Sequence, residues 1–462
     1  MVTALRQWLA SLSCSLCLTM IGTCFMWITP LMVTLVRPDS PVLMTSTQRS
    51  WLASFIEVGM FVSTIPVGIL ADRFGRKKLL LSTGPLILLA WALIIFTRSL
   101  VVLYLVRFLQ GVAMGVGFVV APMYIAETSE PRIRGTLSGQ FQTLYFAGTL
   151  IAYCTGPYLS YNTYAFTLAS LPILFLITFC SMPESPYYLL MVNRTESARK
   201  SLNWLRGGSN VEKEFNSIRY SVEEDMKQKG GWKDLIATRN DRKSLFIVLL
   251  VCLIKFMNGM TALTIYASQT LAEATHDIPY NVMTVILGVV LVVTSFISAF
   301  LSDIIGRRPL LISSTAGCTV FCTFIAIYQY IDQFTDICLA RYSWIYILSM
   351  ISFCVMANIG IGPLVQTLQA EYFPSRTRSI GGAFAQTISS FAAFLNVKLY
   401  ENVSEEIGTY FNYIIFAFVS LVGTIALSII LKETAGKSLG QIQKELKVEQ
   451  DKNNVREECN SA

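Results

Sequence analysis

The chain has 462 residues, of which 53% are hydrophobic and only 14% are charged. A soluble globular domain carries roughly 25% charged residues, so this chain has too little charge to cover a water-facing surface of its size. These values exclude a disordered chain, a disulfide scaffold and a soluble enzyme, and they predict a polytopic membrane protein. The net charge of +7 does not indicate nucleic-acid binding, because the Lys and Arg residues gather in particular loops.

Twelve continuous apolar stretches predict twelve transmembrane helices, since a helix needs about 20 apolar residues to cross a bilayer. A β-barrel is excluded, because its strands are alternating segments of roughly 10 residues. Two groups of six stretches flank one polar segment. The predicted domains are therefore an N-terminal six-helix bundle (1–183), a cytoplasmic helical linker (184–243), a C-terminal six-helix bundle (244–431) and a cytoplasmic tail (432–462). The stretches lie at 8–30, 51–71, 79–97, 100–125, 137–158, 163–182, 244–270, 281–302, 309–330, 343–369, 379–397 and 408–431.

The distribution of positive residues predicts how the chain is oriented in the membrane. If both termini are cytoplasmic, 29 of the 36 Lys and Arg residues fall on the cytoplasmic side and five fall outside. This is the asymmetry that the positive-inside rule describes. The sequon Asn402-Val403-Ser404 then falls outside, in the loop before the last span, and predicts a glycosylation site at Asn402.

The polar segment between the two groups of spans is predicted to be helical. Ala198, Leu202 and Leu205 recur at helical spacing, and Gly207-Gly208 end that run. Further amphipathic stretches follow around 211–229 and 232–241. We expect short helices that lie under the bundle.

The two halves repeat the same layout. Residues 68–77, after the second span, are similar to residues 301–308 after the eighth. Glu127 and Arg134 are seven apart after the fourth span, and Glu371 and Arg378 are seven apart after the tenth. A parallel repeat of six-helix halves places a binding site between the halves, near the middle of the bilayer. The repeat therefore predicts a transporter.

These motifs resemble those of the sugar porters of the major facilitator superfamily, and among them the facilitated trehalose and hexose transporters of insects. The resemblance covers nearly the whole chain and implies an all-α major facilitator fold. It also implies a monomer that carries a hexose or a disaccharide such as trehalose across the plasma membrane by alternating access, without a cofactor. Seven motifs occur in the family's order: 68–77, 107–111, 122–127 with Arg134-Gly135, 183–186, 303–308, Gly362-Pro363 with Glu371 and Arg378, and 433–439.

The resemblance further implies a charge network that closes the cytoplasmic side when the outside is open. Single exposed ion pairs contribute about 0–1 kcal/mol each, so several coupled pairs are needed to bias a two-state equilibrium. For Lys77 and Lys78, topology marking by positive charge is an equal alternative. For Arg107, a charge inside the fourth span, structural support and gating both stay open. The expected members are Asp72, Arg73, Arg76, Arg107, Glu127, Arg134, Asp303, Arg307, Arg308, Glu371 and Arg378.

A sugar site needs amides, hydroxyls and aromatic faces in a largely neutral cavity. The resemblance places the family's sugar-binding glutamine at Gln142. On the seventh span, however, the family pattern Gln-Gln-x-Ser-Gly-x-Asn-Ala reads Lys-Phe-Met-Asn-Gly-Met-Thr-Ala over 255–262. The scaffold motifs are thus retained while much of the usual sugar site is replaced. The candidate substrate-binding residues are Gln140, Gln142, Lys255, Phe256, Thr261, Tyr266, Asn358, Gln366 and Ser389.

Lys255 is the sharpest departure from the family pattern. It either neutralises an intramembrane acid such as Glu57, contacts an anionic substrate, or extends toward the inner interface. Proton-linked members of the family carry a carboxylate in the first span, whereas residues 8–36 contain no Asp, Glu or His. Facilitated diffusion is therefore expected, with ion coupling through Glu57 as the other possibility.

Other classes of function are less compatible with the sequence. The chain lacks a Gly-x4-Gly-Lys-Ser/Thr loop, which disfavours an ATP-driven pump. His276 is the single histidine, so no histidine-rich metal site is expected. The spans show no convergent catalytic set, so an enzyme is not expected. Two alternatives remain: a carrier of another small organic solute on the same fold, and a non-transporting sugar sensor, against which the short tail argues.

Overall fold

The structure is a computed structural model of the chain. It describes residues 2–33, 35, 42–208, 211–227, 231–274, 279–335, 342–373 and 377–433. Within these ranges, the side chains of 2–4, 131–132, 134–136, 138, 274, 299, 302–303, 370 and 378–379 lie outside the description. Every regular element in the described part of the chain is a helix.

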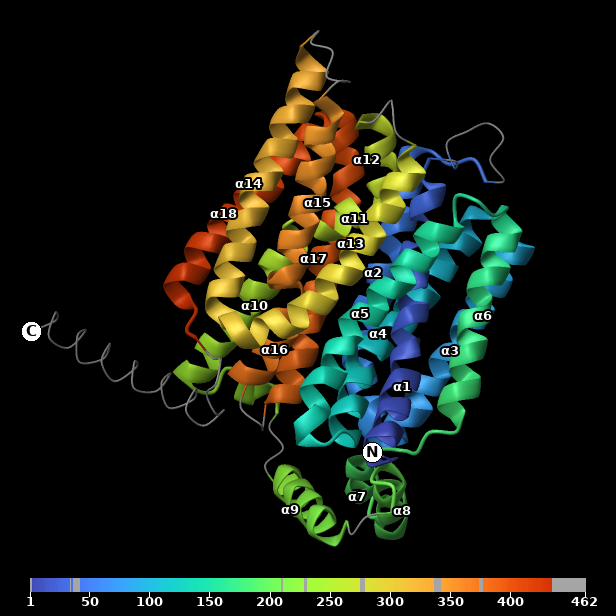
Figure 1. Cartoon of the computed structure of the whole chain (residues 1–462), viewed down its shortest axis with the longest axis vertical. Coiled ribbons are helices and arrows are strands. Elements are labelled where there is room, and N and C mark those ends of the chain that lie inside the picture. The colour runs from blue at the N-terminus through green and yellow to red at the C-terminus, as the bar shows by residue number, and fades with distance from the viewer. Residues whose placement is uncertain are drawn as a thin grey trace, which may run out of the picture.

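Six long helices form the N-terminal half, and they match the first six predicted spans. Most run antiparallel to the helix before them (Figure 1). They are α1 (Val2–Met26), α2 (Ser46–Phe74), α3 (Arg76–Phe96), α4 (Leu100–Thr128), α5 (Pro131–Thr155) and α6 (Tyr161–Cys180), with a 3-10 turn, η1 (Thr29–Leu31), after α1.

The C-terminal half repeats this arrangement with two of its spans interrupted. Eleven helical segments of the described chain are long and apolar enough to cross a membrane. The twelfth predicted span is α5, which is more polar and lies between α1 and α13. The elements are α10 (Arg239–Met257), α11 (Met260–Ile265), α12 (Ala267–Ala274), α13 (Tyr280–Ile305), α14 (Arg307–Phe334), α15 (Ser343–Ile359), α16 (Ile361–Tyr372), α17 (Arg378–Glu406) and α18 (Thr409–Ile430).

The two interruptions lie in the seventh and tenth spans. Gly259 separates α10 from α11 with φ of +93°, a left-handed conformation that glycine adopts without steric cost. Gly360 separates α15 from α16, and Pro363 follows within the first turn of α16. Irregular backbone at membrane depth is tolerated only where protein or a watery cavity surrounds it. The two breaks therefore point to a cavity between them.

Close helix packing in the N-terminal half depends on glycine. A Cβ on Gly111 would overlap the carbonyl of Ile56, and one on Gly59 would overlap the carbonyl of Phe108. On the neighbouring pair α1 and α5, a Cβ on Gly148 would overlap the carbonyl of Thr19. Small residues let helix backbones approach in this way where the lipid supplies no hydrophobic driving force.

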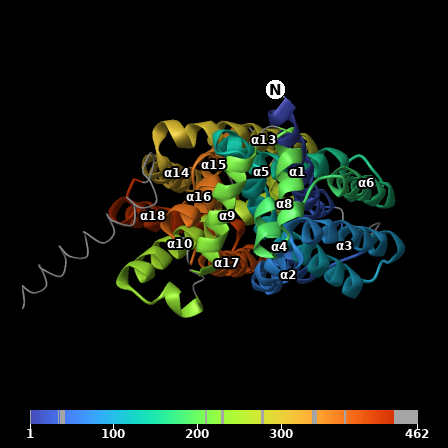
Figure 2. The same cartoon turned by 90° about the horizontal axis from the view of Figure 1, so that it is seen from below.

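The segment between the halves forms short helices at one end of the bundle, below α1 and α4 (Figures 1 and 2). We call this the linker end and the opposite end the far end. The elements are α7 (Pro186–Met191), α8 (Thr195–Leu205), α9 (Glu212–Lys227) and η2 (Trp232–Leu235). The helical run predicted to stop at Gly207-Gly208 is confirmed as α8, and both glycines have positive φ.

A tyrosine joins two of these short helices. Tyr187 follows the Pro-Glu-Ser-Pro motif at 183–186. Its hydroxyl donates a hydrogen bond of 2.7 Å to Asp225 on α9. Burial, followed by this hydrogen bond, raises the pKa of Tyr187. Tyr187 thus connects α7 to α9.

Candidate functional site

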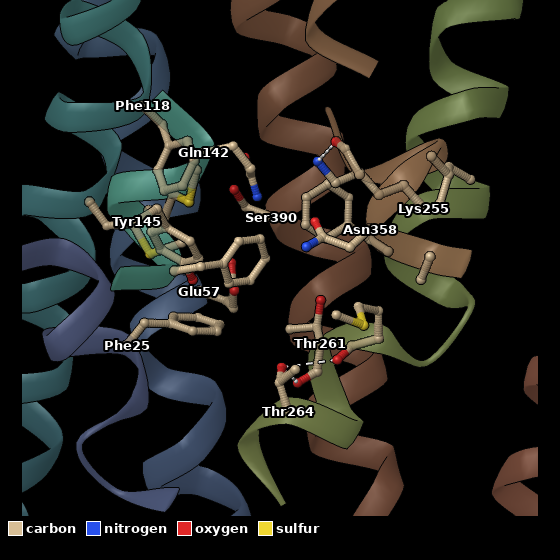
Figure 3. Close-up of a pocket in the computed structure, with 18 of the residues that line it drawn as sticks. Phe25, Glu57, Phe118, Gln142, Tyr145, Lys255, Thr261, Thr264, Asn358 and Ser390 are labelled. Atoms are coloured by element: carbon tan, nitrogen blue, oxygen red, sulfur yellow. Dashed lines mark hydrogen bonds between the residues drawn. The ribbon is translucent and has the colours of Figure 1, made fainter. Parts of the chain in front are cut away.

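A cavity lies between the two halves, beside the breaks in the seventh and tenth spans (Figure 3). Both halves contribute to its wall, as the internal repeat predicts. Side chains of the N-terminal half are Phe25, Met26, Glu57, Met60, Met114, Phe118, Gln142, Tyr145 and Phe146. The C-terminal half supplies Lys255, Phe256, Asn258, Met260, Thr261, Thr264, Ala357, Asn358, Ile361, Gly362, Gln386 and Ser390.

Five of the nine predicted substrate-binding residues line this cavity. Gln142 comes from the middle of α5, and Lys255 and Phe256 come from the last turn of α10. Thr261 begins α11 just after the break, and Asn358 lies near the end of α15. These five positions come from four helices that meet at the two interruptions.

Two of the remaining four predicted residues do not line this cavity, because of helix register. Gln140 is not among the cavity residues, since it lies two positions, and so roughly 200° around α5, from Gln142. Ser389 donates to the carbonyl of Ala385 on its own helix, and its neighbour Ser390 lines the cavity instead.

The other two predictions lie beyond the cavity along their helices. Tyr266 ends α11, fully buried, with its ring stacked on Tyr400 at 4.9 Å between centroids. Its hydroxyl donates to the Val397 carbonyl at 3.4 Å, so it packs α11 against α17. Gln366 lies one turn past Gly362 on α16 and is outside the cavity.

Several cavity groups have no hydrogen-bond partner among the described residues. The side chains of Gln142 and Gln386 make none. Asn258 uses its Oδ1 to accept from the Met260 backbone at 3.0 Å, and its buried Nδ2 has no partner in the described structure. Buried polar groups are nearly always paired, so unpaired ones around a cavity indicate a place where a polar ligand binds.

Glu57 belongs to the cavity although the sequence-based list of binding residues omits it. The residue is 2% exposed, and its carboxylate makes no hydrogen bond or ion pair with any described residue. The Arg107 guanidinium is the positive charge that acts on it. The signal in the sequence is the placement of an acid well inside an apolar span, which is a functional-site hypothesis by default.

Lys255 points to the cavity and does not extend toward the bundle end. Its Nζ donates to the Gly362 carbonyl at 2.7 Å, across the break in the tenth span. The ammonium also lies 5.2 Å from the centre of the Phe256 ring. The interruption of α15 and α16 supplies this carbonyl, which periodicity alone does not predict.

Aromatic rings cover the wall of the N-terminal half. Tyr145 is their centre, with ring centroids 6.3 Å from Phe25, 5.6 Å from Phe118 and 5.4 Å from Phe146. Figure 3 shows Phe25, Phe118 and Tyr145 on the same side as Glu57, facing Lys255 and Asn358. Most of the rings, the acid Glu57 and the amide of Gln142 thus form one wall, while the hydroxyls, the other amides, Phe256 and the lysine form the other.

Arg107 is not part of the linker-end network, which corrects the prediction. It lies near the start of α4, and Glu127 is 20 residues further on, roughly 30 Å along the helix. Its guanidinium is fully buried and donates to the carbonyls of Leu52 (3.0 Å), Cys24 (2.6 Å) and Ala53 (3.2 Å). Arg107 therefore holds α1, α2 and α4 together in the far half of the bundle.

At the linker end, Arg76 is the centre of a network in the N-terminal half. Its guanidinium, 2% exposed, pairs with Glu127 at 3.0 Å and with Asp72 at 3.3 Å. Glu127 also accepts a hydrogen bond from Ser185, just after the last span of this half. Arg73 is exposed and lies over its neighbour's ring, with no ion pair to a described residue.

The C-terminal half has the corresponding pair in looser form. Arg307 lies 3.5 Å from Glu371, with side chains 16% and 18% exposed. Arg308 donates to the Ser428 carbonyl at 2.7 Å. The side chains of the other three predicted members, Arg134, Asp303 and Arg378, lie outside the described residues.

Each half also has a carboxylate that caps its third helix, a role the sequence did not predict. Glu184 accepts from the Lys77 backbone N–H at 3.0 Å, at the start of α3. Glu433 accepts from the N–H groups of Arg307 (3.0 Å) and Arg308 (3.1 Å), at the start of α14. The preceding Gly75 has φ of +100°, like Gly306 at +97°. Carboxylates stabilise helix N-termini by pairing with free N–H groups.

The far end is closed by a cluster that we call the far-end clasp: Arg49, Ser50, Lys398 and Glu401. Arg49 on α2 pairs with Glu401 on α17 at 2.6 Å. Beside them, Lys398 donates to the Ser50 hydroxyl at 3.0 Å. The clasp joins the two halves directly. In the count of positive residues, Arg49 and Lys398 were two of the five on the outer side, without a role of their own.

Asn402 lies inside α17, which continues to Glu406, and not in a loop as expected. The hydroxyl of Ser404, the third residue of the sequon, accepts from Asn412 Nδ2 at 2.8 Å. The sequon is therefore held in the last turns of a helix and bonded to α18.

The comparisons with known proteins agree with this architecture. A profile of the family described as "Sugar (and other) transporter" matches residues 10–446. The facilitated trehalose transporter Tret1 of Bombyx mori is 28% identical over 404 residues, which are 87% of this chain and 80% of the relative. Tret1 of Apis mellifera ligustica is 28% identical over 443 residues, 95% of this chain and 88% of the relative.

Solved structures share the fold at lower sequence identity. The xylose transporter XylE from E. coli, in a partially occluded inward-open conformation, superposes with a TM-score of 0.78 at 19% identity and covers 94% of this chain and 99% of its own. The proton:xylose symporter XylE bound to 6-bromo-6-deoxy-D-glucose superposes with a TM-score of 0.77 at 19% identity. The match covers 96% of this chain and 99% of the symporter. The predicted major facilitator fold is thus confirmed. Because the family profile spans nearly all of the described bundle, this chain belongs to the sugar (and other) transporter family of membrane proteins.

Proposed function

We propose that this chain carries a hexose or a disaccharide such as trehalose across the plasma membrane by facilitated diffusion. The observation that carries the proposal is the cavity between the halves, where the amides of Gln142, Gln386 and Asn258 have groups without described partners beside aromatic rings. Sugar hydroxyls pair with amides, and apolar sugar faces pack on rings. The names of the insect relatives support the same class of solute.

Alternating access follows from the way the halves meet. The cavity lies between the repeats, so rocking one half against the other exposes it to one side at a time. The far-end clasp is formed in this structure. Opening at the far end therefore requires Arg49 to separate from Glu401. We infer that the linker end faces the cytoplasm, with both termini, because Lys and Arg gather there. A monomer suffices, since the cavity is built from one chain.

Uptake into proteoliposomes tests the proposal. Purified full-length protein is reconstituted, and entry of labelled trehalose and glucose is measured with and without an imposed pH gradient. Facilitated diffusion predicts saturable uptake that stops at equal concentrations and does not accumulate with the gradient. Liposomes without protein are the control. Uptake equal to this control for both sugars would overturn the proposal.

A carrier of another small organic solute is the second candidate. The observation in its favour is that the cavity contains the acid Glu57 and the base Lys255, which a neutral sugar does not require. The sequence of the seventh span also favours this candidate. Lys255 and Phe256 stand where the pattern of the resembled family has two glutamines.

A further inference from the structure

The cavity has an acid on one wall and a base on the opposite wall. Glu57 comes from α2 in the N-terminal half, and Lys255 comes from α10 in the C-terminal half. Figure 3 shows the two residues on facing sides of the space, with Ser390 and Asn358 between them. No ion pair joins them in the described structure. The acidic and basic groups of the cavity therefore lie on opposite walls without pairing to each other.

Charges of this kind need partners. Removing an ionised carboxylate or ammonium from water is costly unless it is paired and hydrogen-bonded. A neutral polyol offers hydroxyls to both groups but balances neither charge. A solute with a single charge would balance one group and leave the other, or repel it. A solute with both charges matches the two walls at once.

The wall around Glu57 has the chemistry of an ammonium site. Tyr145 and Phe25 lie on that wall together with the sulfur-containing side chains of Met60 and Met114. Aromatic faces attract cations, and the Glu57 carboxylate, which makes no hydrogen bond or ion pair with a described residue, supplies a counter-charge. Among these residues, Glu57 is 2% exposed, so its charge is screened little by water.

The wall around Lys255 has the chemistry of a carboxylate site. One N–H of its ammonium is used by the Gly362 carbonyl, which leaves two donors, since a lysine has three. The buried Nδ2 of Asn258, one turn away on the same span, is a further donor without a described partner. Two N–H groups of Lys255 and the two of the Asn258 amide therefore remain for an anionic oxygen pair.

We propose that the cavity binds a small zwitterion, with its ammonium group at Glu57 and its carboxylate at Lys255. The inference rests on the proposed alternating-access carrier and extends its cargo from uncharged sugars to aliphatic amino acids. Selectivity follows from charge matching: a plain amine meets Lys255 without an anion, and a plain carboxylate meets Glu57 without a cation.

The first experiment uses the unaltered protein in proteoliposomes. Labelled glycine, 4-aminobutanoate and 6-aminohexanoate probe three spacings between the charges, and butylamine and butyrate carry one charge each. At least one of the three zwitterions enters saturably, at least tenfold faster than butylamine or butyrate. The inference is overturned if all three zwitterions enter only as fast as they enter protein-free liposomes. It is also overturned if butylamine or butyrate enters as fast as the zwitterions.

The second experiment changes the two walls. Glu57→Gln and Lys255→Gln each lower kcat/KM for the zwitterion at least tenfold. Glu196→Gln and Lys200→Gln, on exposed positions of α8, are matched controls with no change. Glu57→Lys combined with Lys255→Glu restores part of the uptake, because the solute binds in the reverse direction. A purely structural role for the charges predicts that the double change is worse than either single change.

Sugar uptake separates this inference from the proposed function. Zwitterion uptake without trehalose or glucose uptake overturns the sugar proposal and leaves the inference intact. Sugar uptake without zwitterion uptake overturns the inference and leaves the sugar proposal intact. If monodisperse, reconstituted protein moves neither class of solute, both fail.

Discussion

Arg49 on α2 and Glu401 on α17 form an ion pair of 2.6 Å with side chains only 7% and 2% exposed. The pair joins the two halves of the molecule at the end opposite the linker helices. Arg49 also donates to the Met32 carbonyl at 3.1 Å and to Gln269 at 3.4 Å. A buried pair with these additional bonds keeps its geometry, so it is the contact that an opening at the far end must break.

Glu401→Gln is expected to favour opening at the far end. Removing one partner of a buried ion pair costs roughly 3–5 kcal/mol, because the other charge is left uncompensated. The measurement is labelling of Gln386→Cys in the cavity by an impermeant maleimide added at the far side, which should increase several-fold. Glu405→Gln, at an exposed position on the same helix, is the control. Equal labelling in both backgrounds contradicts a gating role for the clasp.

The two linker-end pairs are expected to differ in importance. Arg76 is 2% exposed and pairs with Glu127 at 3.0 Å, whereas Arg307 is 16% exposed and lies 3.5 Å from Glu371. Removing one partner of a buried pair costs roughly 3–5 kcal/mol, and the cost is smaller where the pair is longer and its arginine more exposed, as at Arg307. Glu127→Gln should therefore lower the rate of uptake at least tenfold, and Glu371→Gln should lower it less. A larger loss from Glu371→Gln would refute this ranking.

Gln142 and Gln140 provide a matched pair on α5. Gln142 lines the cavity and Gln140 does not. Loss of one hydrogen bond to a neutral group costs about 0.5–1.5 kcal/mol, so Gln142→Ala should lower kcat/KM for the transported sugar about threefold to tenfold. Gln140→Ala should leave it unchanged. Competition by unlabelled sugar gives the affinity of each variant, and an effect of equal size at both positions would argue against the cavity as the binding site.

Two glycines test the close packing of α2 and α4. A Cβ on Gly111 overlaps the Ile56 carbonyl, while one on Gly68 meets nothing within 4 Å. Gly111→Ala is expected to destabilise the protein by about 1–3 kcal/mol through overpacking. Gly68→Ala should be neutral or stabilising by up to about 1 kcal/mol, because alanine favours helix. The midpoint temperature of unfolding in detergent, read by size-exclusion chromatography, separates the two. Equal midpoints would show that the helices adjust without cost.

The spans could be predicted because the bilayer imposes a strong rule on composition. Each predicted stretch corresponds to a described helix or pair of helices. The seventh span is interrupted at Gly259. Site residues were harder to predict. Gln142 and Lys255 were identified by comparison with the motifs of the resembled family, whereas Gln140 and Ser389 were displaced from the cavity by one or two steps of helix rotation. A sequence of polar residues on a helix does not say which face meets the partner half.

The amino-acid sequence by itself determined the class of protein, the number of spans and their division into two related halves, because burial in lipid demands long apolar helices and duplication leaves visible motifs. Only the tertiary structure decided that Arg107 supports the far half of the bundle, that Arg49 meets Glu401, and that Glu57 faces the same cavity as Lys255. These relationships join residues that are tens to hundreds of positions apart. They depend on the rotation of each helix about its axis and on how the helices pack against one another. Hydropathy gives the position of each span along the chain but not its rotation or its neighbours.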